Sequence, residues 1–304
     1  MGIGKYIKEI GRGKDGARAL TRDQASDLFG QVLDGEVTDL EVGAFCLAMR
    51  IKGETPQEMA GFLDATHQRL NLVPAGSRND TPIIVIPSYN GARKLPVLTP
   101  LLALLLAREG LPVLVHGTAT ESTRVYTSKV LLALGVRAHA AINTIANGEI
   151  AFAPTELLCA GLARLLDVRR VVGLRNPAHS VVKLMNPCAG KSLIVSSYTH
   201  PEYAVFMAAT FELMQSNAML LRGTEGEAVA NPRRTPHMEG FIAGGRLLLQ
   251  EAQSGTLTTL PDLPKAFDAE STAAYIRQVM AGTNPVPTSI ARQVEHILHL
   301  SKQL

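Results

Sequence analysis

A short apolar run, residues 83–86, ends in a polar turn that is followed at once by two cations. In α/β proteins a turn after a buried strand often holds phosphate, because backbone N–H groups there point at the anion. This turn has a single glycine, Gly91, whereas phosphate cradles usually have several, which let the chain pass close to the anion. The stretch therefore predicts a buried strand followed by an anion-binding turn that has fewer glycines than a typical phosphate-binding loop.

The chain after residue 82 alternates short apolar runs with helical patterns, which is typical of an α/β domain with a mainly parallel central sheet. Residues 223–263 are rich in turn formers. Strands are expected at residues 83–86, 112–115, 193–196 and 218–221, and helices at residues 99–109, 123–134, 156–166, 201–215, 269–281 and 288–302.

The first 74 residues show only helical spacing. Thr21 with Gln24, and Thr55 with Glu58, have the spacing of a capping box at a helix start. We therefore expect a small N-terminal helical domain over residues 1–74, joined by a helical segment at about 163–190. The α/β domain is expected over residues 75–304.

Composition limits the compartment and the kind of partner. The three cysteines are odd in number and far apart, which favours a reducing compartment over a disulfide or metal framework. The longest apolar run, residues 95–107, contains two prolines and is shorter than the ~20 residues that span a bilayer. We expect a cytoplasmic protein without a membrane partner. The absence of tryptophan and an aromatic content of 5% argue against a base-stacking platform.

The charge is unevenly distributed along the chain. The net charge is +3, but residues 83–195 carry 12 Lys/Arg against 5 Asp/Glu, and each flanking segment has a net charge of −2. A basic segment in a nearly neutral chain indicates a localised anion-binding surface. An ordinary solvated basic face is the alternative.

Several motifs, in their order along the chain, resemble the anthranilate phosphoribosyltransferases of glycosyltransferase family 3. They are Val115-His116-Gly117, residues 168–175 (VRRVVGLR), Asn186-Pro187, residues 200–202 (HPE) and residues 223–226 (GTEG). The resemblance implies a helical domain followed by an α/β domain of the nucleoside phosphorylase type. It also implies phosphoribosyl pyrophosphate as substrate, held by a Gly-Thr-Gly-Gly-Asp loop, and magnesium held by an Asp-Glu pair.

The chain differs from that family at the positions that bind the diphosphate and magnesium. The loop lacks the acidic end and most glycines, and Ala228 and Val229 stand where the Asp-Glu pair belongs. Magnesium needs carboxylates beside substrate phosphates, so we expect no metal and no catalytic residue, with Glu225 and Glu227 as the remaining weak metal candidates. The resemblance makes the loop and the end of the next strand a vestigial phosphate pocket, formed by Ser88, Tyr89, Asn90, Gly91, His116 and Gly117.

Residues 8–14, 86–94 and 222–227 look like the corresponding segments of the anthranilate phosphoribosyltransferase-like DNA-binding proteins of the YbiB type. That similarity implies a homodimer, formed through the helical domain, that binds DNA or RNA with little sequence preference and needs no cofactor. It does not imply transferase activity.

The candidate nucleic-acid contacts are the cations near these motifs. Arg93 and Lys94 are expected at a helix start, where cations oppose the helix dipole unless an anion compensates. Arg93, Lys94, Arg124 and Lys129 could instead be ordinary surface charges, and Arg169 could form a salt bridge to Asp167 or Glu156. The full set is Arg93, Lys94, Arg124, Lys129, Arg169, Arg170, Arg175 and Lys183. An active, magnesium-dependent phosphoribosyltransferase and a regulatory module that binds a protein or a nucleotide remain as rival functions.

Overall fold

The computed structural model describes residues 2–13, 15–75, 81–257 and 260–304. The chain divides into two compact units. Unit 1 consists of Met1–Asn71 and Thr155–Pro187, and unit 2 of Leu72–Pro154 and Cys188–Leu304. The helical segment that returns to unit 1 begins earlier than the expected residue 163. Lys14, within the basic stretch near the N-terminus, lies outside the described residues.

Unit 1 is helical, as expected from its sequence pattern. The capping boxes predicted at Thr21 and Thr55 are both present, and a third joins Thr38 to Glu41. Such boxes satisfy N–H groups that a helix start leaves without partners. The helices are α1 (Gly4–Ile10), α2 (Arg22–Asp34), α3 (Asp39–Lys52), α4 (Pro56–His67), α7 (Thr155–Leu158), α8 (Ala160–Val172) and α9 (Ala178–Leu184).

The core of unit 1 joins α2, α3 and α4 through three fully buried rings. Phe29 stacks on Phe62 with centroids 4.7 Å apart, and Phe45 meets both rings edge-on. Helix α8 approaches α2 so closely that a Cβ atom at Gly161 would overlap the backbone carbonyl of Leu33. Glycine is therefore needed at the start of α8 for this packing.

Unit 2 contains a mainly parallel sheet in the order β3-β2-β1-β4-β5-β7-β8, with β6 paired to β5. The first five strands in that order run parallel, whereas β6, β7 and β8 pair antiparallel. The strands are β1 (Ile83–Pro87), β2 (Val113–Gly117), β3 (Ile150–Pro154), β4 (Ser192–Tyr198), β5 (Ala218–Thr224), β6 (Glu227–Ala230), β7 (Met238–Ile242) and β8 (Gly245–Gln250).

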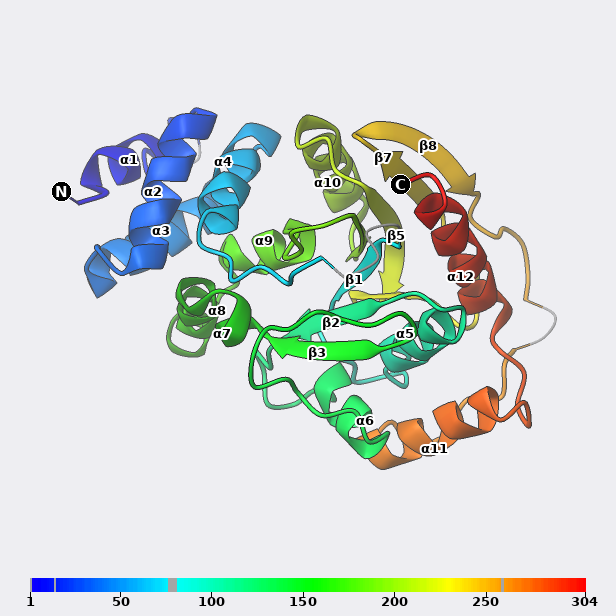
Figure 1. The fold of residues 1–304 in the computed structure, drawn as a ribbon. Helices are drawn as coiled ribbons and strands as arrows, with labels where there is room; N and C mark the ends of the chain where they lie inside the picture. Colours follow the sequence, from blue (N-terminus) through cyan, green and yellow to red (C-terminus); the bar gives the residue numbers. More distant parts are fainter. Residues whose placement is uncertain (1, 14, 76–80, 258–259) are drawn as a thin grey trace. The chain divides into compact units, whose positions relative to one another are not determined.

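Alternate residues of the strands face a core shared with α5, α6, α11 and α12, while α10 packs against β4 and β5 (Figure 1). Because β1, β2, β4 and β5 are parallel, their carboxyl ends meet at one edge of the sheet. The loop after β1 and the turn after β5 both emerge there. The helices are α5 (Thr99–Arg108), α6 (Thr127–Ala133), α10 (Pro201–Leu213), α11 (Ala269–Met280) and α12 (Thr288–Ser301).

Three details of the chain differ from the expectations. Residues 223–263 contain β6, β7 and β8, not only turns, and β3 was not expected at all. Helix α6 begins at Thr127, because Val125 is still paired with Ala92 in an antiparallel bridge. In the described part of the chain, no helix is long and apolar enough to cross a membrane.

Replacing Gly161 with alanine should lower the free energy of unfolding by about 1–3 kcal/mol, since α8 must move away from the α2 backbone. The matched control is Gly4→Ala, where a Cβ atom meets nothing within 4 Å. That change should stay within about 0.5 kcal/mol. Urea denaturation measures both, and equal effects would contradict the close approach of the two helices.

Candidate functional site

The loop after β1 folds around carboxylates that belong to the chain itself. Residues 88–91 are buried, and the Ser88 N–H donates to the His116 carbonyl at the end of β2, at 2.8 Å. Gly117 ends β2 beside Ser88. The loop is therefore held against the carboxyl ends of β1 and β2, where the sequence predicted an anion site.

Glu227 places a carboxylate inside this loop. Its side chain is 1% exposed, and its Oε1 accepts the backbone N–H groups of Asn90 at 2.8 Å and Gly91 at 2.7 Å. Its Oε2 accepts the hydroxyl groups of Ser88, Thr99, at 3.1 Å, and Thr127, at 3.4 Å. Five hydrogen-bond donors thus surround one buried carboxylate, in the way that donors of a phosphate-binding loop surround a bound phosphate.

Glu225 fills the second half of the loop in the same manner. Its carboxylate accepts the backbone N–H groups of Arg93 at 3.0 Å, Lys94 at 2.8 Å and Leu95 at 3.0 Å. These N–H groups are exposed or partly exposed, so Glu225 is bound near the surface while Glu227 is bound in the interior.

The β5–β6 turn presents both carboxylates to the loop. Thr224 pairs with Glu227, so Glu225 and Gly226 form a two-residue turn with φ values of 52° and 89°. Positive φ at both positions is the type I′ geometry, in which glutamate is a strained choice at the first position. A Cβ at Gly226 would overlap the Asn90 side chain, which donates to the Glu225 carbonyl at 3.2 Å. The β5–β6 turn and the loop after β1 are therefore in direct contact, and each restricts the conformation of the other.

Tyr89 and His116 form a buried pair beneath the loop. The Tyr89 hydroxyl and His116 Nδ1 lie 2.8 Å apart, and both side chains are buried. Burial lowers the pKa of His116 to about 3, so the ring is neutral at physiological pH. His116 Nε2 has no hydrogen-bond partner among the described residues. The neutral, fully enclosed imidazole thus serves as a buried hydrogen-bond partner of Tyr89 beneath the loop.

The four predicted cations of unit 2 occupy different environments. Arg93 and Lys94 are exposed but lie in the loop, and the expectation that they start a helix is wrong, because α5 begins at Thr99. Arg124 precedes α6 and does not lie on it; its guanidinium donates to Glu121, at 3.1 Å, and to the Gly91 carbonyl, at 3.3 Å. Lys129 is exposed on α6.

The other four predicted cations lie in unit 1: Arg169 and Arg170 are near the end of α8, Lys183 is on α9, and Arg175 is in the segment between the two helices. Arg170 pairs with Asp167, one of the two carboxylates considered from the sequence as partners of Arg169. Burial, with the nearby charges of Arg175, Arg169 and Lys183, lowers the pKa of His179 to about 3. These three cations are therefore close enough to act on one imidazole, and they form a cluster that we call the α8–α9 cations.

Sequence reasoning missed the role of Glu227. From the sequence, Glu225 and Glu227 are weak candidates for metal ligands. In the structure, both carboxylates accept hydrogen bonds from backbone amides of the loop. Within the described residues, no three His, Cys, Asp or Glu side chains are placed to hold a metal. The sequence did contain a clue: the loop lacks the aspartate expected from the resemblance, and a glutamate, Glu227, stands beside the β5–β6 turn.

Comparison with known proteins identifies the family to which the chain belongs. A family model described as the glycosyl transferase family helical bundle domain matches residues 5–69. The uncharacterized protein YbiB of Escherichia coli (strain K12) is 42% identical over 304 residues, which is 97% of this chain and 92% of that protein. The chain belongs to the YbiB family.

More distant matches of this YbiB-family protein are anthranilate phosphoribosyltransferases. The one from Methanosarcina acetivorans is 28% identical over 269 residues, covering 86% of this chain and 68% of that enzyme. The crystal structure of the Thermus thermophilus enzyme superimposes with a TM-score of 0.71 at 22% identity, covering 96% of this chain and 85% of that one. The Saccharomyces cerevisiae enzyme in complex with PRPP and Mg gives 0.70 at 14% identity, covering 99% and 88%. These structures show a shared fold.

Removing the Glu227 carboxylate should destabilise the protein. Glu227→Ala leaves two buried N–H groups and three hydroxyls without their acceptor, which should cost about 2–4 kcal/mol. Glu227→Gln keeps one acceptor oxygen for both N–H groups and should lose less. Urea denaturation of the two variants tests this, and an alanine variant as stable as the native protein would contradict the arrangement.

His116 should make stability depend on pH. The folded ring stays neutral down to a pKa of about 3, whereas the unfolded ring takes a proton near its ordinary value of 6.5. The contribution is complete above pH 6.5 and is lost as pH falls, by up to about 1.4 kcal/mol per pH unit. His116→Gln should flatten the decline between pH 6.5 and 4 in denaturant titrations. Parallel declines in the two proteins would contradict a neutral His116.

Proposed function

We propose that this YbiB-family protein binds DNA or RNA with little sequence preference and does not transfer phosphoribosyl groups. The observation that carries the proposal is the closed loop: its backbone N–H groups are already bonded to Glu225 and Glu227. A diphosphate would need such groups, and it would also meet two negative charges held in its place. The protein thus has the transferase-like fold, but carboxylates of its own chain, Glu225 and Glu227, occupy the loop that would bind a small anion.

The α8–α9 cations supply the surface that such a function needs. Arg169, Arg175 and Lys183 are partly exposed residues of α8, α9 and the segment between them, and the charge of each lowers the pKa of His179. Sequence-neutral binding requires cations spaced along a surface, because the release of condensed counterions from the phosphate backbone provides the free energy. The side chains of Arg93, Lys94 and Lys129 are exposed and add further positive charge in unit 2.

The fixed backbone of the loop supports a role for Arg93 and Lys94. Their N–H groups are bonded to Glu225, the Lys94 side chain is exposed, and the half-exposed Arg93 guanidinium lies 4.0 Å from the Glu121 carboxylate. Cations on an ordered backbone lose less conformational freedom on binding than cations on a mobile loop. The Glu225 carboxylate that holds them reduces the local charge, so the contribution of this pair is smaller than that of the α8–α9 cations.

A homodimer formed through the helical domain is part of the proposal. Helix α3 exposes Leu40, Leu47 and Ile51, with exposed fractions of 83%, 47% and 62%. Their spacing of seven and four residues puts them on one helix face, and an exposed apolar stripe of this kind marks an association surface. A second copy would cover the stripe and combine two sets of cations, which raises apparent affinity by linkage.

The same proposal includes a cytoplasmic location and no cofactor. Cys46, Cys159 and Cys188 are buried, and none of them forms a disulfide within the described residues, which supports a reducing compartment. Magnesium would be required only for the rival transferase chemistry. Ala228 and Val229 are each 1% exposed within the core, and neither can ligate a metal.

Replacing Arg169, Arg175 and Lys183 with alanine should weaken binding to DNA of any sequence and reduce the slope of log affinity against log salt by about three. The control removes three exposed cations outside the proposed set, Arg108, Arg137 and Lys302, which should have a much smaller effect. Fluorescence anisotropy over a salt series measures both. Salt-independent binding, or tight calorimetric binding of phosphoribosyl pyrophosphate with magnesium, would contradict the proposal.

A charge placed in the α3 stripe should separate the dimer. Leu47→Glu should convert a dimer to a monomer in light scattering after size exclusion, because a buried unpaired carboxylate is costly at an interface. Leu132→Glu is the control, since Leu132 is 60% exposed on α6 of unit 2. A native protein that is already monomeric, or a Leu47→Glu variant that stays dimeric, would count against this interface.

A further inference from the structure

Three consecutive backbone N–H groups of the loop after β1 converge on one oxygen atom. The N–H groups of Arg93, Lys94 and Leu95 donate to Oε1 of Glu225 at 3.2, 2.8 and 3.0 Å, and the Arg93 N–H also lies 3.0 Å from Oε2. Successive N–H groups that point at one place form an anion-binding concavity. We call residues 93–95 the amide nest. A carboxylate oxygen of Glu225 lies where an oxygen of a bound phosphate would lie.

The amide nest is accessible from solvent, in contrast to the half of the loop that Glu227 fills. Arg93 and Lys94 are exposed and Glu225 is partly exposed, whereas Glu227 is 1% exposed. A partly exposed carboxylate that leaves the nest regains water, so its release costs little desolvation energy. Removal of the Glu227 carboxylate would instead leave buried donors without an acceptor. Of the two carboxylates, only Glu225 is placed where an external anion can replace it.

The backbone of the β5–β6 turn indicates that glutamate is kept at this position for its carboxylate. The φ angle of Glu225 is 52°, and type I′ turns favour Asn, Asp or Gly at the first central position. The turn is also held by a bond that the Glu225 side chain does not make, since the Asn90 side chain donates to the Glu225 carbonyl at 3.2 Å. The carboxylate can therefore leave the nest while the turn keeps its conformation.

The residues of the amide nest also bring positive charge to it. Lys94 is exposed, and the Arg93 guanidinium is half exposed at 4.0 Å from the Glu121 carboxylate. An anion in the nest would thus be attracted by the side chains of the same two residues whose N–H groups bind it. Hydrogen bonds to a charged acceptor are stronger than those between neutral groups.

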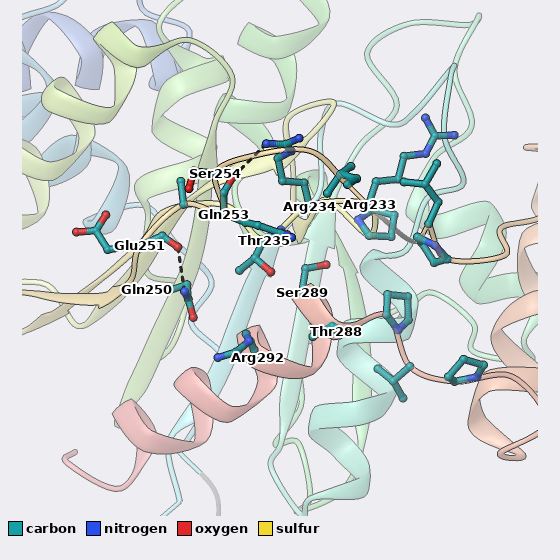
Figure 2. A pocket seen from close by; sticks show the side chains of 18 residues that line it. Arg233, Arg234, Thr235, Gln250, Glu251, Gln253, Ser254, Thr288, Ser289 and Arg292 are labelled. Carbon is teal, nitrogen blue, oxygen red and sulfur yellow. Dashed lines mark hydrogen bonds between the residues drawn. The ribbon is translucent and has the colours of Figure 1, made fainter.

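A cavity elsewhere in unit 2 lacks this convergence of donors. It lies between the segment after β6 and the start of α12, and Figure 2 shows the side chains of Arg233 and Arg292 on opposite sides of it. Arg234 donates to the carbonyls of Gln253 at 3.2 Å and Gly255 at 3.0 Å, which holds the chain after β8. The cations of the cavity are spread apart, whereas the N–H groups of the amide nest meet at one oxygen.

We propose that a phosphodiester group of a bound DNA or RNA strand displaces the Glu225 carboxylate and takes its place in the amide nest. This inference rests on the proposed function and adds a regulated contact to it. In the free protein Glu225 covers the nest; in the complex a phosphate oxygen accepts the N–H groups of residues 93–95. A strand held by other cations presents its phosphates at a high effective concentration, so they compete with a carboxylate of the chain itself.

Glu225→Asn removes the carboxylate and supplies a residue that suits the turn. We expect the full-length variant to bind a single-stranded DNA of about twelve nucleotides more tightly than the native protein, by about five-fold or more, because the apparent affinity is limited by the fraction of molecules in which the nest is open. Glu109→Gln is the matched control: Glu109 is an exposed glutamate directly after α5, and its loss changes the net charge equally. The control should gain about two-fold at most. Fluorescence anisotropy at one salt concentration measures both.

The native protein supplies a second test that needs no variant. DNA should shift the amide resonances of residues 93–95 in heteronuclear NMR, and inorganic phosphate at the same concentration of phosphate groups should shift them much less. Amide resonances that do not respond to DNA would overturn the inference, and so would equal gains in Glu225→Asn and Glu109→Gln. Equal shifts with inorganic phosphate would assign the nest to the free ion and would also overturn it. DNA binding that is absent from the native protein would contradict the proposed function and this inference together, whereas the other outcomes leave the proposed function standing.

Discussion

The hydrogen bonds of the buried Glu227 carboxylate tie the β5–β6 turn to the loop after β1 and to the first residues of α5 and α6. Buried backbone N–H groups need acceptors, and a loop shaped to receive an anion presents several of them at once. Here one buried carboxylate serves Asn90, Gly91 and three hydroxyls. With that need met inside the chain, the loop can be dense, with Tyr89 packed on His116 where the related enzymes are expected to have open space for a substrate.

The β5–β6 turn makes this closure possible at the cost of local strain. A glutamate with positive φ is unusual, and here its carboxylate is bound by consecutive N–H groups of the loop. The strand that follows buries Ala228 and Val229, where carboxylates would be needed to hold magnesium. The loop, the turn and the strand that follows therefore form one packed interior around Glu227.

How far the sequence predicted this structure depends on the range of the interactions. The helix starts at Thr21 and Thr55 and the alternation of strands and helices follow from neighbours a few residues apart, and they were predicted. The position of the anion loop after β1 was also predicted. The role of Glu227 was not, because its partner Asn90 is separated by 137 residues. Arg93 and Arg124 were misplaced for a similar reason: Val125 pairs with Ala92, which delays α6, and Glu225 binds the N–H groups of residues 93–95 in the loop before α5.

The most direct test of the closed loop is to supply an external anion when the internal one is removed. Thermal unfolding of the native protein and of Glu227→Ala would be followed as inorganic phosphate replaces chloride at constant ionic strength. The difference between the two proteins cancels the effect of phosphate bound elsewhere on the protein. The account predicts that phosphate raises the unfolding temperature of the variant by about 2 °C or more beyond its effect on the native protein. An equal response of the two proteins would show that the loop is not an anion site filled by Glu227.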